Sequence, residues 1–231
     1  MNIIKYIITF VTSWLNRKKA DDEPKFSPPP VTRVEAPNPP DEGRLVIRYD
    51  VTQKWHKGWA RDLKDITEVC IHHTESNTMD TDQWINYILN PEPARIKRQK
   101  EAESLFPFLI GFTGQIAKFG PLSRWWWASS SGKHDAQVVN IEICQGNKEF
   151  KDVQIDSLCW LIFDYILYHC PNMRRIVGHD FNNNLYSGNR KGCPGNLFPW
   201  AKLEQEMNNR GITFTNTKIE CYDLIILGDG I

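Results

Sequence analysis

A proline-dense segment divides this chain of 231 residues into a short N-terminal part and a long C-terminal part. Seven of the fourteen prolines fall between Pro24 and Pro40, in a stretch with almost no aromatic residues. Proline removes backbone N–H donors and favours extended polyproline II, so residues 20–43 are expected to form a semi-rigid tether. The packed part should therefore begin near Arg44 and run through residues 44–231 as one domain.

The N-terminal part, residues 1–19, has the periodicity of an amphipathic helix. Its apolar residues recur at intervals of three and four: Ile3, Ile4, Ile7, Ile8, Val11, Trp14 and Leu15. Such a helix is too short to span a bilayer, and its basic residues follow it, which does not match a cleavable signal peptide. We expect it to anchor the chain on a membrane surface or to dock on a protein partner, for example in a virion; packing against its own domain is the alternative.

The composition excludes two classes of protein. Basic and acidic residues number 28 each, so the basic surplus of a nucleic-acid-binding domain is absent, and no nucleic acid partner is expected. The sequence has no run of 18 apolar residues, which excludes a conventional membrane span. The six cysteines are widely spaced and mostly lie in apolar surroundings, so we expect free buried thiols, with Cys193 as the exception argued below.

Beyond residue 44, short β-rich runs alternate with helical ones. The expected strands are Ile66–His72, Phe108–Phe112, Ile116–Phe119, Val138–Cys144 and Arg175–Gly178. The expected helices are Thr81–Leu89, Ile155–Tyr168 with Pro171 after its end, and Phe198–Asn209. This alternation predicts an α/β fold in which a mixed central β-sheet is flanked by helices.

Two histidines and a cysteine form the most informative group of reactive residues. His72 and His179 stand at the ends of predicted strands, and Cys193 follows His179 by fourteen residues. Two imidazoles and a thiolate suit zinc, and three protein ligands leave a fourth position for water, as in catalytic sites. Each residue alone also has an ordinary explanation as a hydrogen-bonded histidine or a turn cysteine, so the spacing leaves both interpretations open.

Four segments carry a resemblance that favours the metal site. They are IHHTES (71–76), FLIGFTGQI (108–116), VVNIEICQG (138–146) and IVGHDF followed by RKGCPGNLFPW (176–200). In this order and spacing, residues 66–205 resemble the type-2 family of zinc-dependent N-acetylmuramoyl-L-alanine amidases. That family shares its fold with the peptidoglycan-recognition proteins and includes bacteriophage lysins.

The resemblance implies a role for each of five residues. His72, His179 and Cys193 would hold the zinc, Glu142 takes the acidic position of the family, and Lys191 takes the basic position before the third ligand. Zinc with these ligands can bring a bound water to a pKa near 7, and Glu142 could accept the proton of that water. Lys191 would stabilise the negative oxygen that forms when the amide is attacked. The implied substrate is peptidoglycan, and the implied location is a virion or the bacterial cell envelope.

The sequence departs from the family pattern at several positions. Phe106 stands where many members have tyrosine, and Asn140 stands where the pattern has glycine. Trp126, Trp127 and Phe106 are candidate substrate contacts, although consecutive residues of a strand alternate faces, so core packing is expected for at least one tryptophan. The basic insertion 90–104 either lines the substrate groove or forms a solvated helical face.

Two alternatives to an amidase follow from the same residues. One is a peptidoglycan-binding module without turnover, for which Phe106 would be the signature. The other is a virion structural protein with a relic amidase fold, whose function would come from residues 1–19. Retention of Glu142 and Lys191 beside the three ligands favours the enzyme, because a binding module needs neither. A serine hydrolase is disfavoured, since the chain has no G-x-S-x-G motif.

Overall fold

The computed structural model describes residues 46–48, 58–74, 79, 81–89, 106–128, 132–145, 149–186, 192–218 and 220–225. The helix expected at 1–19, the tether at 20–43 and the insertion at 90–104 lie outside these residues, so their structures stay predictions. Among the described helices, none combines the length and apolar character needed to cross a membrane.

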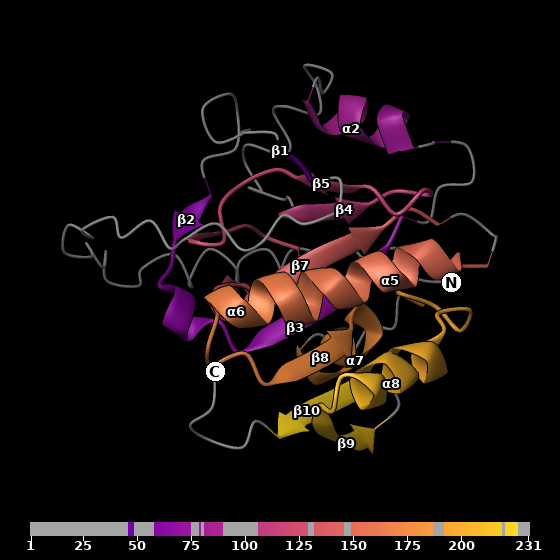
Figure 1. Ribbon diagram of the computed structural model, residues 1–231. Coiled ribbons are helices and arrows are strands. Elements are labelled where there is room, and N and C mark those ends of the chain that lie inside the picture. The colour runs from indigo at the N-terminus through magenta and orange to yellow at the C-terminus, as the bar shows by residue number, and fades with distance from the viewer. Residues whose placement is uncertain are drawn as a thin grey trace, which may run out of the picture. The chain divides into compact units, whose positions relative to one another are not determined.

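A mixed β-sheet lies at the centre of the described residues (Figure 1), as the sequence predicts. Its strands are β1 (Val46–Arg48), β3 (Glu68–His73), β4 (Phe108–Ile110), β5 (Ile116–Lys118), β7 (Val138–Ile143), β8 (Arg175–Gly178), β9 (Thr213–Lys218) and β10 (Cys221–Ile225). Their spatial order is β1-β5-β4-β7-β3-β8-β10-β9. The central strands β4, β7, β3 and β8 are mutually parallel, whereas β5, β10 and β9 join by antiparallel pairing with β4, β8 and β10. Strands β2 (Trp59–Ala60) and β6 (Arg124–Trp125) form a small separate sheet.

The helical elements are η2 (Leu63–Asp65), α2 (Thr81–Leu89), α4 (Gly132–Asp135), α5 (Asp152–Trp160), the π-helical segment η3 (Leu161–Ile166), α6 (Leu167–His169), α7 (His179–Tyr186) and α8 (Trp200–Asn209). The expected long helix is present as the continuous run α5, η3 and α6, and it ends just before Pro171, which cannot continue a helix. In Figure 1 this run crosses the front of the sheet, with α8 beside it over β8 and β10.

The main core lies between the sheet and this long helical run. Strands β3 and β7 are almost entirely buried, as expected for central parallel strands that are covered on both faces. Val69 and Ile71 of β3 pack in one cluster with Ile155, Leu158 and Ile162 of the helical run. Each such side chain contributes about 1.5–3 kcal/mol on burial, so this layer fixes the register of the sheet.

The opposite face of the sheet carries two smaller apolar clusters and a polar strip between them. One cluster joins Leu109 and Trp126 with residues of α2, and the other joins Cys70 and Val177 with Phe181 of α7. Because strand side chains alternate between faces, the residues that share this face on β3 and β7 are Glu68, Cys70, His72, Val138, Asn140 and Glu142. Their polar members form the strip in which the candidate site lies.

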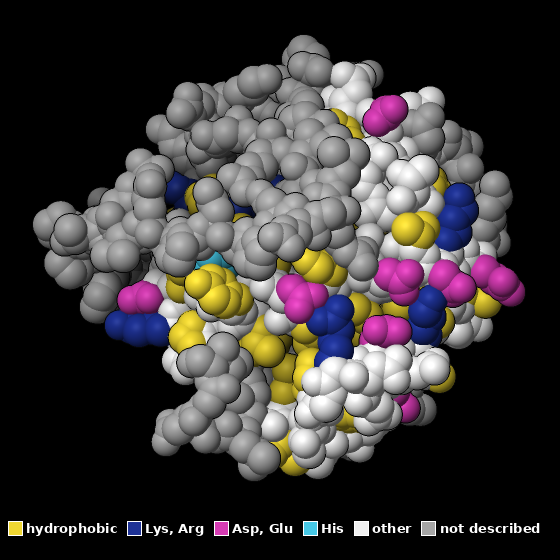
Figure 2. Space-filling model, in the orientation of Figure 1, with side chains coloured by type: hydrophobic (Ala, Val, Ile, Leu, Met, Phe, Trp, Pro, Cys, Tyr) yellow, Lys and Arg dark blue, Asp and Glu magenta, His cyan; other side chains and the backbone are white. Residues whose placement is uncertain are grey.

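Several ion pairs lie on the side of the sheet that the long helical run covers. Lys202 of α8 contacts Asp152 of α5 at 2.7 Å, and Arg210 contacts Asp164 of η3 at 2.9 Å. Figure 2 shows basic and acidic side chains interspersed among the described residues of this face. Exposed pairs of this kind each contribute about 0–1 kcal/mol, so they stabilise the packing of α8 against α5 and η3 only modestly.

Candidate active site

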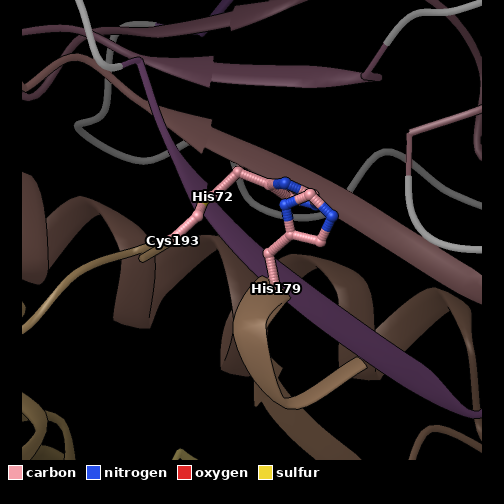
Figure 3. A group of neighbouring side chains, drawn as sticks. All are labelled: His72, His179 and Cys193. Carbon is pink, nitrogen blue, oxygen red and sulfur yellow. The ribbon is translucent and has the colours of Figure 1, made fainter. Parts of the chain in front are cut away.

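His72, His179 and Cys193 come together on the polar strip (Figure 3). One potential ligand atom from each residue lies within 4.8 Å of those of the other two. The two imidazole rings are 4.2 Å apart between centroids and are tilted by 48°. All three residues are buried, with exposed fractions of 5%, 8% and 5% respectively. The structure therefore places the three sequence-predicted ligands in one group.

Three different segments position these side chains. His72 lies near the C-terminal end of β3, and His179 is the first residue of α7, directly after β8. The loop with Cys193 is held against both, because Asp180 donates its backbone N–H to the Cys193 carbonyl at 2.7 Å and His73 donates its backbone N–H to the Cys193 sulfur at 3.4 Å. These two contacts fix the position of the Cys193 sulfur relative to β3 and α7.

Close packing at Gly178 also keeps this group compact. A Cβ atom at this position would lie 2.8 Å from Cδ of Pro194 and 3.0 Å from a carboxylate oxygen of Glu220. Because Gly178 immediately precedes His179 and Pro194 immediately follows Cys193, any larger residue would push two ligand-bearing segments apart. Glycine is therefore required here for steric reasons.

The donor set fits a zinc ion. Zinc bonds of about 2.0–2.3 Å in tetrahedral geometry separate the ligand atoms by roughly 3.3–3.7 Å, so small side-chain adjustments from the present geometry suffice. Two imidazoles and a sulfur are ligands that zinc prefers, and three protein ligands are typical of catalytic zinc sites. The residues present therefore fit the metal that the sequence resemblance implies.

Glu142 lies next to this group on the neighbouring strand. The parallel pairing of β3 with β7 places Glu142 directly opposite His72, so both side chains leave the same face of the sheet. Glu142 is half-buried, whereas the rest of β7 is buried. Glu142 therefore leaves the sheet on the same face as His72 and is partly accessible to solvent.

Asn140 and Asp135 are site residues that sequence reasoning missed. His72 Nε2 lies 2.8 Å from Asn140 Oδ1, and Asn140 Nδ2 lies 3.4 Å from Asp135 Oδ1. Both residues are almost completely buried, with exposed fractions of 2% and 0%. The signal that could have found Asn140 is its place two residues before Glu142, in a strand position where the family pattern has glycine.

A second polar cluster surrounds the buried Glu68 on the same face. Glu68 contacts His134 at 3.0 Å and Arg175 at 3.8 Å, and it accepts a hydrogen bond of 2.9 Å from Asn182 of α7. Burial, reinforced by the charge of Glu68, raises the pKa of the Cys70 thiol well above its ordinary value. Cys70 therefore stays a neutral thiol although it shares a face with His72.

The remaining predicted site residues differ in whether the structure describes them and in how exposed they are. Lys191 lies outside the described residues, so its role stays a prediction. Trp127 is 40% exposed and remains available for contact with a ligand. Phe106 is half-buried and packs edge-on against Phe119 at 6.1 Å between ring centroids, so part of its surface serves the core.

Trp126 is a correction to the sequence interpretation. It is only 1% exposed, and its ring is enclosed by Gly58 and Gly120, whose added Cβ atoms would lie 2.6 Å and 2.5 Å from it. Its side chain belongs to the cluster with Leu109 and therefore cannot stack on a sugar. The alternation along consecutive residues explains why Trp127 is exposed while its neighbour is buried.

The family to which the chain belongs follows from a sequence comparison. The family model for N-acetylmuramoyl-L-alanine amidase (Amidase_2) matches residues 62–196, which is more than half of the chain. The chain belongs to this family. Its matched region contains all three clustered ligands and Glu142, so membership supports a general role in peptidoglycan cleavage or binding. A search of curated protein sequences finds no significant match.

Solved structures show the same fold at low sequence identity. The N-acetylmuramoyl-L-alanine amidase LysC from Clostridium intestinale URNW is 19% identical with a TM-score of 0.53, and the match covers 71% of this chain and 97% of that one. The catalytic domain of XlyA is 19% identical with a TM-score of 0.50, covering 70% and 98%. Drosophila peptidoglycan recognition protein SD is 14% identical with a TM-score of 0.51, covering 70% and 94%. Because amidases and a recognition protein share this fold, the fold alone does not separate hydrolysis from binding.

Proposed function

We propose that this chain is a zinc-dependent N-acetylmuramoyl-L-alanine amidase that cleaves the amide bond between the lactyl group of N-acetylmuramic acid and L-alanine in peptidoglycan. The observation that carries this proposal is the buried group of His72, His179 and Cys193 with Glu142 in register beside it. Family membership supports the proposed reaction class. A module that only binds peptidoglycan has no need for a carboxylate next to three metal ligands.

His72, His179 and Cys193 would hold the zinc. When bound at such a site, zinc supplies Lewis-acid chemistry that polarises a carbonyl and makes water a nucleophile near neutral pH. The protein's own contribution is to keep these ligands buried and fixed by the contacts around Cys193 and His72. Burial lowers the local dielectric and strengthens each electrostatic interaction with the substrate.

Glu142 is assigned the role of general base and acid. Its carboxylate accepts a proton from the attacking water and then returns a proton to the departing amine of L-alanine. This double role requires a group that reaches both the reacting atoms and solvent, which agrees with its half-buried position. Lys191 is assigned the stabilisation of the oxygen that becomes negative during attack, a type of interaction that typically accounts for about 3 kcal/mol.

The test is turnover of purified sacculi by the full chain. We expect wild type to release L-alanine amino termini, and we expect Glu142→Gln to be slower by about 10²–10⁴-fold, because the amide cannot accept the proton. Treatment with a chelator should abolish turnover, and added zinc should restore it. The matched control is Glu149→Gln, an exposed glutamate outside the site, which should leave the rate unchanged.

Two outcomes would count against the proposal. Release of reducing sugar ends instead of free amines would identify a glycosidase and reject the bond assignment. Binding of sacculi without turnover would favour the second candidate, a recognition module, for which the shared fold with Drosophila recognition protein SD and the presence of Phe106 are the supporting observations.

A further inference from the structure

The buried amide of Asn140 links a proposed metal ligand to the interior of the protein. Its Oδ1 lies 2.8 Å from Nε2 of His72, and its Nδ2 lies 3.4 Å from Oδ1 of Asp135. Asn140 is in the centre of β7, and the register pairs it with Cys70, two residues before His72 on the same face. The short contact therefore joins diagonal neighbours on adjacent parallel strands.

The direction of these hydrogen bonds follows from Asp135. Its Oδ1 accepts the backbone N–H of Ala128 at 3.4 Å, so this oxygen acts as an acceptor in the network. The amide group of Asn140 must then turn its NH₂ towards Asp135, because the reversed amide would set two acceptor oxygens against each other. The Asn140 oxygen consequently faces His72.

The orientation of the amide determines the tautomer of His72. An amide oxygen only accepts hydrogen bonds, so Nε2 of His72 must carry a hydrogen to make the 2.8 Å contact. A neutral imidazole with hydrogen on Nε2 has its lone pair on Nδ1. The network thus leaves Nδ1 as the atom with which His72 can coordinate a metal.

We infer that Asn140 is a positioning residue that fixes His72 in the Nε2–H tautomer and in the orientation needed for coordination through Nδ1, while Asp135 holds the Asn140 amide. The inference rests on the proposed role of His72 as a zinc ligand. Second-sphere partners of metal-bound histidines act in this way, and their loss typically weakens metal affinity about 10–100-fold.

The first experiment reads the tautomer in the metal-free wild-type chain. Long-range ¹H–¹⁵N correlation spectra of ¹⁵N-histidine-labelled protein, with His72 assigned through His72→Gln, should show hydrogen on Nε2. Hydrogen on Nδ1 in wild type would overturn the inference. This measurement needs no folded variant at position 140.

The second experiment measures the affinity for zinc ion itself by competition with a chromogenic chelator. Asn140→Ala should bind zinc about 10–100-fold more weakly than wild type and should lose the single tautomer of His72. The control is Gln154→Leu, which removes another buried side-chain amide, one that donates to the Cys144 carbonyl at 2.7 Å and lies in the helical layer. Its zinc affinity should match that of wild type.

The outcomes separate this inference from the proposed function. Equal zinc affinity for wild type and Asn140→Ala, or an equal loss in Asn140→Ala and Gln154→Leu, would overturn the positioning role. If the tautomer and the affinity loss are as expected but wild type does not cleave sacculi, only the proposed amidase activity fails. If wild type binds no zinc, both the positioning role of Asn140 and the proposed zinc-dependent activity are refuted.

Discussion

Replacement of Arg61 by methionine is expected to lower the free energy of unfolding by about 3 kcal/mol. Arg61 lies between β2 and β3 and donates its side-chain N–H groups to four backbone carbonyls, those of Leu122, Asp135, Ala136 and Val138. It thereby ties the loop before β6 to the turn between α4 and β7. Burial lowers the pKa of Arg61 to about 10, so the guanidinium still carries its charge at neutral pH.

The magnitude follows from the geometry of the four contacts. The bonds to Leu122 and Val138 are short, whereas those to Asp135 and Ala136 are 3.3 and 3.4 Å and count for little. Each short bond from a charged donor contributes about 1.5–3 kcal/mol, and water can reach part of this half-buried site in the variant, which places the loss near the lower limit of the sum. Arg61→Lys keeps the charge but lacks the several fixed N–H donors of the guanidinium group. We therefore expect it to lose roughly half as much free energy of unfolding as Arg61→Met.

The assay is thermal and urea unfolding of the full chain. A loss of about 3 kcal/mol corresponds to a decrease in Tm of roughly 6–12 °C for a domain of this size. The matched control is Lys64→Met, because Lys64 is 69% exposed and pairs with Asp62 on the surface, where removal should cost at most about 1 kcal/mol. Equal Tm values for Arg61→Met and Lys64→Met would refute the reasoning.

Three further predictions follow from burial and from the domain boundaries. Trp126→Ala should destabilise the domain by about 3–5 kcal/mol in urea unfolding, whereas Trp127→Ala should change stability by less than about 1 kcal/mol; similar losses would contradict the assigned burial. Burial raises the pKa of Cys159 and of Cys170 from 9.0 to about 12, so unfolded thiols lose their protons first and stability should fall by about 1.4 kcal/mol per thiol per pH unit above pH 9. Urea unfolding at pH 8 and pH 10 checks this, and the Cys159→Ala, Cys170→Ala double variant should show a shallower pH dependence. Deletion of residues 1–43 should leave turnover of isolated wall material unchanged; a loss would mean that the N-terminal part contributes to catalysis.

The grouping of His72, His179 and Cys193 could be predicted from the sequence because the family resemblance added to local signals at each residue. The sequence places His72 and His179 at the ends of predicted strands, and it places Cys193 in a turn beside proline and glycine. Asn140 and Asp135 could not be assigned in this way. Their contacts depend on the register between β3 and β7, which is a property of pairing across distant parts of the chain and not of any local pattern.

The secondary structure shows the same division between strong and weak patterns. Helix Thr81–Leu89 and strand Arg175–Gly178 agree with the sequence prediction at both ends. Helix α7 was missed because its sequence, HDFNNNLY, is rich in asparagine, a weak helix former that tertiary packing overrides here. Strand β9 was missed because TFTNTK is mostly polar and lies at the edge of the sheet, where little side-chain burial is needed.

The clustered side chains of His72, His179 and Cys193 come from a strand, a helix start and a loop that are remote from one another along the chain. An ion shared among them would act as a cross-link that forms only in the native state. Its binding energy would therefore add to the free energy of unfolding. At a free concentration a thousandfold above Kd, this linkage amounts to about 4 kcal/mol. Only folded protein would then hold the ion. Depriving cells of the metal would lower the amount of folded protein as well as any activity that depends on the ion.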